Sequence, residues 1–238
     1  MIRTLEAAAA WVDEVGLALL FPKADAVLPS LWEQVNGSAD ENWAVRDADG
    51  SFVRWSDAMS FLWRAKDELP ARGLVCVGKH VARVATCVSP ALLPVLVAAN
   101  AAEPEGDEQR VVTAVAEAGP LTGPQVREAT GLTKKETDRA VAALHRKLVL
   151  TNAELVEGDA GWGAIAHDLL ERKWRLAALP ARAHARHALA RHVLELAGEL
   201  TAADLAGLFG WRRREAAELL EEVGRGRDET GFRIWTPQ

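Results

Sequence analysis

A gap-free internal repeat in the second half of the chain places the strongest constraint on its fold. Thr122 and Gly131 match Thr201 and Gly210, and each pair is 79 residues apart (201 − 122 and 210 − 131). A unit that recurs at a fixed offset indicates one supersecondary motif used at least twice. A threonine that can cap a helix, followed by a glycine at a turn, predicts a helix-turn-helix in each copy.

The composition is typical of a soluble globular protein with two or three small domains. The chain has 238 residues, of which 49% are hydrophobic and 26% charged. We expect a mainly α fold with small β-wings, arranged as tandem winged helix-turn-helix modules. The expected parts are a Trp-rich N-terminal module at 1–102, which can be read as a diverged winged helix, a winged helix at 108–165, and a connecting helix with a C-terminal winged helix at 166–238.

The N-terminal part is expected to combine helices with one hairpin. Apolar residues at helical spacing predict a helix over 5–20. A serine in a capping position predicts a helix over 56–69. Short apolar runs within 74–85 predict a hairpin that turns at Gly78, and a further helix is expected over 90–102.

The second module carries the clearest helix signals. The patterns at 122–125 and 133–136 fit capping boxes, so a helix should start at each. Short strands near 148–150 and 162–164 would form the wing.

The third module should repeat this plan after a connecting helix over 166–179. Its helices are expected at 187–196, 201–209 and 213–223, and its final strand at 232–235.

Cysteine usage and hydropathy predict a cytoplasmic protein. The two cysteines, Cys76 and Cys87, make no disulfide framework. No apolar run approaches the roughly 20 residues of a membrane helix, and no signal peptide is evident. His184 and His187 lack a third ligand, and Cys76 and His80 are irregularly spaced, so neither a metal site nor a cofactor is predicted.

Local clusters of basic residues predict contact with double-stranded DNA, although the net charge of the chain is −6. The third helix of a winged helix usually enters the major groove. His145 is expected on the same outward face of this helix. The alternative is an ordinary solvated face, on which Glu136 and Asp138 oppose the basic residues. The candidate DNA-binding residues are Lys134, Lys135, Arg139, Arg146, Lys147, Arg175, Arg182, Arg186, Arg212, Arg213 and Arg214.

The third module is the weaker candidate for this role. Four glutamates follow its three arginines within the last predicted helix, at 215–222. Such a helix would repel phosphate, so packing or dimerisation is the alternative.

The tryptophans also have two interpretations. Nine occur in the chain, and they either pack in the core or stack on unpaired bases.

Several segments resemble those of the AlkZ-like (YcaQ) DNA glycosylases, and especially their AlkZ-related subgroup of unassigned activity. These segments are at 16–22, 63–70 and 118–122. The resemblance implies tandem winged helices around a DNA channel and excision of alkylated or crosslinked bases. It also implies a catalytic motif of Gln, an apolar residue, and Gln or Asp. Its nearest match gives Gln34 and Asn36 as catalytic candidates, although an asparagine can orient water but cannot act as a general base.

Three functional hypotheses follow. The first is a DNA-binding protein of tandem winged helices linked to DNA repair. The second is a DNA glycosylase. The third is a protein-interaction scaffold or homodimer without nucleic acid.

Overall fold

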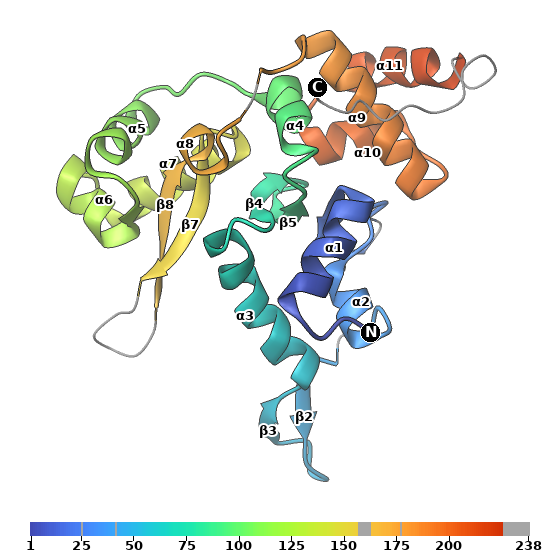
Figure 1. Ribbon diagram of the computed structural model, residues 1–238, viewed down its shortest axis with the longest axis vertical. Helices are drawn as coiled ribbons and strands as arrows, with labels where there is room; N and C mark the ends of the chain where they lie inside the picture. The colour runs from blue at the N-terminus through green and yellow to red at the C-terminus, as the bar shows by residue number, and fades with distance from the viewer. Residues whose placement is uncertain (25, 41, 157–162, 177, 226–238) are drawn as a thin grey trace.

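The computed structural model describes residues 1–24, 26–40, 42–156, 163–176 and 178–225. These residues are mainly α-helical and form small antiparallel sheets (Figure 1). This agrees with the expected mainly α fold with small β elements. Within these ranges, no helix is both long enough and apolar enough to cross a bilayer. The predicted strand at 232–235 lies outside the described residues.

The N-terminal unit is built around a small sheet in which the strands are ordered β1, β5, β4. A separate hairpin follows α2 in sequence and projects away from the body beyond the N-terminal end of α3 (Figure 1). The unit consists of α1 (Leu5–Val15), β1 (Leu17–Leu19), α2 (Leu31–Asn36), the hairpin strands β2 (Ala44–Arg46) and β3 (Phe52–Trp55), α3 (Asp57–Ala71), β4 (Cys76–Val81) and β5 (Val84–Val88).

The predicted helix over 5–20 is wrong for its last five residues. Gly16 adopts φ 72°, and its N–H donates to the carbonyl of Val12 at 2.7 Å, which ends α1. The next residues, Leu17–Leu19, form β1 and pair with β5. An apolar run fits a buried strand as well as a helix, so the pattern alone could not separate them.

The predicted hairpin exists, but its turn lies four residues later than Gly78. Ala82 and Arg83 have φ 52° and 59°, and left-handed conformations at two central residues suit a tight hairpin turn. Gly78 lies inside β4 instead. A Cβ there would be 2.4 Å from Nε2 of His80, so this glycine allows the imidazole to lie close to the strand.

The middle unit also contains a three-stranded sheet, with the order β6, β8, β7. Both predicted capping boxes form, and Gly131 adopts the left-handed conformation at the turn between α6 and α7. The elements are α5 (Asp107–Ala118), β6 (Leu121–Thr122), α6 (Gly123–Thr130), α7 (Lys134–Arg146), β7 (Leu150–Val156), β8 (Ala164–Leu169) and α8 (Leu170–Trp174).

The connecting helix predicted over 166–179 is largely wrong. Its first residues belong to β8, which pairs with β7, and the helical part is the short α8. Ala166 and Asp168 are buried while their neighbours are less so, which is the alternation of a strand. Part of the predicted wing, 157–162, lies outside the described residues.

The C-terminal helices are α9 (Arg182–Ala197), α10 (Ala202–Phe209) and α11 (Arg213–Arg225). The bounds of α10 and α11 lie 79 residues after those of α6 and α7. α4 (Leu93–Asn100) follows the N-terminal sheet in sequence but packs against α9. A single apolar cluster therefore joins the N-terminal sheet to the C-terminal helices.

Candidate functional site

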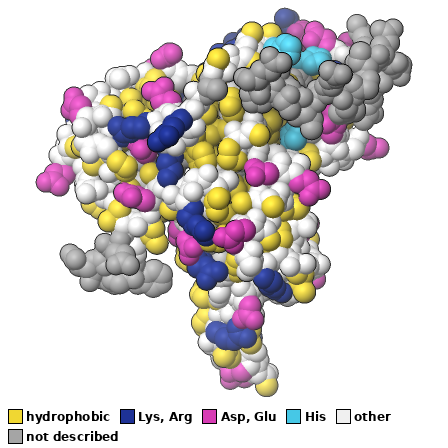
Figure 2. All heavy atoms as spheres, in the orientation of Figure 1, with side chains coloured by type: hydrophobic (Ala, Val, Ile, Leu, Met, Phe, Trp, Pro, Cys, Tyr) yellow, Lys and Arg dark blue, Asp and Glu magenta, His cyan; other side chains and the backbone are white. Residues whose placement is uncertain are grey.

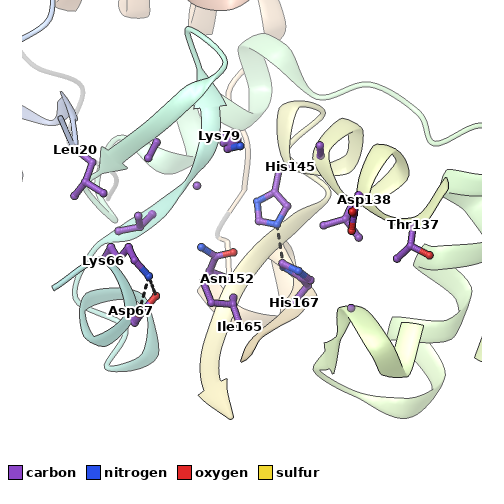
Figure 3. Close-up of a pocket in the computed structure, with 16 residues that line it drawn as sticks. Leu20, Lys66, Asp67, Lys79, Thr137, Asp138, His145, Asn152, Ile165 and His167 are labelled. Carbon is purple, nitrogen blue, oxygen red and sulfur yellow. Dashed lines mark hydrogen bonds and ion pairs between the residues drawn. The ribbon is translucent and has the colours of Figure 1, made fainter. Parts of the chain in front are cut away.

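A cavity of about 410 Å³ lies where the N-terminal and middle units meet (Figure 3). One side comes from α3 and β4, and the other from α7, β7 and β8. The cavity therefore forms only when the two units pack together. Sites for small organic ligands commonly have volumes of about 300–1,000 Å³, so this cavity could hold one.

α7 turns one face toward the cavity. Thr137, Val141 and His145 are four residues apart and lie on one side of the helix. Oγ1 of Thr137 and Nδ1 of His145 are buried and have no hydrogen-bond partner among the described residues. An unpaired buried polar group costs about 1–3 kcal/mol, so these two atoms are unfavourable for the stability of the fold.

His145 and His167 form a hydrogen-bonded pair in this wall. Nε2 of His145 lies 3.2 Å from Nδ1 of His167, and one of the two nitrogens must donate while the other accepts. Behind the pair, Nδ1 of His80 lies 2.7 Å from the carbonyl oxygen of His145, and Nε2 of His80 lies 3.5 Å from Sγ of Cys76. A buried chain of polar groups thus connects β4 to α7 and β8.

Burial keeps these imidazoles neutral. Desolvation lowers the pKa of His80 to about 4 and the pKa of His167 to about 4. Desolvation also lowers the pKa of His145, with further lowering by the nearby His80 and His167. The pKa of the Cys76 thiol is raised to about 12 by desolvation. At neutral pH the site therefore offers uncharged donors and acceptors.

The charged residues around the cavity balance one another. Nζ of Lys66 lies 2.7 Å from Oδ2 of Asp67, and this pair lies across the cavity from the histidines (Figure 3). Lys79 and Asp138 add one charge of each sign. With both histidines neutral, the lining has no net charge.

Sequence reasoning missed this cavity. His145 was expected on the outward face of its helix, yet only 4% of it is exposed. The hydrophobic spacing of α7 gave no signal, because the residues that line the cavity with it come from β7, β8 and the N-terminal unit and are distant in sequence. Within the described ranges, no group of three or more His, Cys, Asp or Glu side chains is placed to hold a metal ion.

The predicted DNA-binding residues of α7 and of its C-cap fall into three groups. Lys134 and Lys135 are exposed at the start of the helix. Arg139 and Arg146 line a separate hollow that also contains acidic side chains from α5 and α7. Nζ of Lys147 lies 2.6 Å from Oε2 of Glu108. Lys134 and Lys135 are therefore the residues of this set whose positive charge is least offset by neighbouring acidic side chains.

The arginines before and within α9 also differ in exposure and in their contacts. Arg175 and Arg182 are exposed. Arg186 instead makes internal contacts: its guanidinium lies 3.3 Å from a carboxylate oxygen of Glu215 and 5.1 Å from the ring centre of Trp211. These contacts fasten α9 to α11.

The arginines that lead into α11 are exposed, but two are paired with glutamates. Arg214 lies 3.2 Å from Glu218, and Arg212 lies 4.0 Å from Glu215. Arg213 makes no ion pair with another described residue. The acids that follow these arginines therefore offset much of their charge.

The catalytic candidates Gln34 and Asn36 lie in the last turn of α2, and neither lines the cavity. Nδ2 of Asn36 donates to the carbonyl oxygens of Ser38 and Asp40 at 3.2 and 3.1 Å. This amide holds the loop after α2, and the structure does not bring it together with the DNA-binding candidates of α7.

The visible surface does not gather its charge into one basic patch. In Figure 2, Lys and Arg side chains form a broken line from the region of α5 and α8 toward the β2–β3 hairpin. Asp and Glu side chains lie beside many of them, and hydrophobic surface runs between.

A match to a protein-family model covers most of the chain. A family model described as AlkZ related matches residues 2–210. The chain belongs to the AlkZ-related family. The resemblance predicted from the sequence is thereby confirmed, and AlkZ-related membership gives the protein a DNA-repair context. No curated protein and no solved structure matches the chain.

Proposed function

We propose that this AlkZ-related protein binds double-stranded DNA through tandem winged helices and acts in DNA repair. The observation that carries the proposal is the family match over residues 2–210.

The order of elements in two units supports the winged-helix assignment. In the N-terminal and middle units, a helix and a short strand precede two helices and two longer strands. In both sheets the first strand pairs with the last one. α3 and α7 would then be the third helices, which usually enter the major groove. The β2–β3 hairpin would be an insertion between the second and third helices of the N-terminal unit.

Lys134 and Lys135 are the side chains best placed to contact DNA phosphates. They lie at the exposed start of α7, whereas Lys147 and Arg186 are committed to ion pairs with Glu108 and Glu215. The N-terminal end of a helix also carries partial positive charge, which favours phosphate.

The double substitution Lys134→Ala/Lys135→Ala should weaken duplex binding. The slope of log affinity against log salt concentration is negative, and each phosphate contact adds about 0.9 to its magnitude. Loss of two contacts should therefore reduce the magnitude of this slope by roughly 2. Fluorescence anisotropy with a labelled duplex at several salt concentrations measures both affinity and slope.

Arg212→Ala/Arg214→Ala is the matched control, because it removes the same charge from side chains already paired with glutamates. Its effect should be clearly smaller. Absence of duplex binding by the unmodified protein at low salt would refute the proposed function. An equal effect of both double substitutions would refute the assignment of contact to α7.

Base excision by Gln34 and Asn36 is the second candidate function, favoured by the family match. In that case Gln34→Ala should abolish the formation of abasic sites in alkylated DNA while duplex affinity stays unchanged. Abasic-site formation is measured by strand cleavage after alkali treatment. Unchanged cleavage with Gln34→Ala would rule out this site assignment.

A further inference from the structure

A second cavity, of about 390 Å³, lies between the end of α1 and one face of α9. Asp13 and Glu14 line it from the last turn of α1. His184, His187 and Arg191 line it from α9, where their spacing of three and four residues places them on one side of the helix. No described residue lines both this cavity and the one beside α7, so the two are separate sites.

The α1 wall carries negative charge that no described residue offsets. Asp13 and Glu14 are exposed, and neither forms an ion pair with another described residue. The last turn of α1 contains no basic side chain, and the C-terminal end of a helix already carries partial negative charge. Partial desolvation raises the pKa of Asp13, which a nearby positive charge would lower again. A positively charged group in the cavity would therefore stabilise this wall.

The α9 wall supplies the opposite charge. Arg191 is the only lysine or arginine among the described residues that line the cavity, and it forms no ion pair with any of them. Glu195 adds a negative charge to the same lining. Opposite charges between other helices of this chain do pair, as Arg186 does with Glu215. Arg191 and the acids of α1 instead line one cavity without closing it, which leaves both signs of charge open to a ligand.

The lining also offers uncharged hydrogen-bonding groups. Desolvation lowers the pKa of His187, and Arg191 lowers it further, so its imidazole is neutral near pH 7 and can both donate and accept. Ser89 is only 1% exposed. Its Oγ accepts from the N–H of Leu92 at 3.2 Å, and the hydroxyl donates to no other described residue. The hydroxyl proton is thus available to an acceptor in the cavity.

Apolar side chains supply much of the remaining surface. Leu92 and Val95 come from the start of α4, and Ala188 from α9. A ligand that fits this lining has an ammonium group, a carboxylate and an apolar body. Short peptides with free ends combine these features, and their amide groups can bond to a neutral imidazole or a hydroxyl. The volume lies within the range of about 300–1,000 Å³ that is common for small-ligand sites.

We propose that this cavity binds a short apolar peptide of about two residues, with its amino terminus at Asp13 and Glu14 and its carboxylate at Arg191. The site requires no bound nucleic acid, so the inference is independent of the DNA binding proposed above.

Isothermal titration calorimetry of the full chain with leucyl-leucine at pH 7 tests the site. N-acetyl-leucyl-leucine lacks the ammonium group, and leucyl-leucinamide lacks the carboxylate. Each should bind at least about tenfold more weakly than leucyl-leucine, because a hydrogen bond to a charged group contributes that much or more to affinity.

Two variants assign the two ends of the peptide. Asp13→Asn/Glu14→Gln should weaken leucyl-leucine at least about tenfold but should not weaken the N-acetyl peptide, which has no ammonium group to lose. Arg191→Gln should weaken leucyl-leucine but not leucyl-leucinamide. Arg182→Gln is the matched control, because Arg182 is exposed on α9 and does not line the cavity. Circular dichroism checks that each variant is folded.

Losses confined to these matched pairs of variant and peptide would support the inference. Absence of binding by leucyl-leucine at about 10 mM, which would saturate a site of about 1 mM affinity, would overturn it. Equal affinity for the three peptides would reveal nonspecific apolar contact and would also overturn it. Binding that both variants leave unchanged would place the peptide elsewhere and refute the assignment to this cavity.

Discussion

Trp32→Ala should lower the free energy of unfolding by about 3–5 kcal/mol, the usual cost of removing a large buried aromatic side chain. The Trp32 side chain is fully buried. Its ring centre lies 4.4 Å from that of Trp43 and 6.3 Å from that of Phe21, and its Nε1 donates to the carbonyl of Asp40 at 3.0 Å. The substitution would therefore remove an aromatic cluster and leave a cavity. Urea unfolding followed by circular dichroism measures the loss.

Trp55→Ala is the control for this experiment. Trp55 lies on the projecting β3 strand and is 53% exposed, with Phe52 as its aromatic neighbour at 5.0 Å. Its replacement should cost less than about 1 kcal/mol. Similar losses for both variants would contradict the assignment of Trp32 to the core.

Acid should weaken the folded state strongly through the buried histidines. The pKa of His80 and the pKa of His167 fall from 6.5 to about 4 in the folded protein. Between these values the unfolded chain binds more protons, so the free energy of unfolding decreases as the pH falls from about 7 toward 4. Near pH 5 the decrease is about 1.4 kcal/mol per pH unit for each histidine. The full contribution of each neutral histidine to stability is therefore present only above the unfolded pKa of 6.5, and it is lost as the pH falls toward the folded pKa of about 4.

Urea unfolding at several pH values between 4 and 7.5 checks this dependence. Carboxylates also contribute to acid unfolding, so the histidine share is isolated by substitution. His167→Gln should reduce the slope of the free energy of unfolding against pH by up to about 1.4 kcal/mol per pH unit, which corresponds to one proton. Equal slopes for His167→Gln and the unmodified protein would contradict the prediction.

Local signals in the sequence predicted the local structure well. The capping boxes at Thr122 and Thr133 and the left-handed Gly131 depend on residues three or four positions apart, so a single segment contains the whole cause. The helices α10 and α11 follow from the same pattern 79 residues later.

Structure that depends on distant partners could not be predicted. Leu17–Leu19 form a strand because β5 lies beside them, and β8 replaces the start of a predicted helix because β7 pairs with it. The cavity depends on contacts of α3 with β7 and of α7 with β4, which no periodicity encodes. Of the predicted DNA-binding residues, Lys147 and Arg186 are held in ion pairs by partners outside their own helices.

The packing of α4 on α9 has a consequence for the order in which the chain can acquire its structure on the ribosome. α4 is apolar on most of its surface, and Leu93 and Leu96 share a cluster with Leu189 and Val193. The residues that cover α4 are synthesised only after the whole middle unit has emerged. Until then the nascent N-terminal unit exposes a hydrophobic helix, which is a state that chaperones recognise and that favours aggregation.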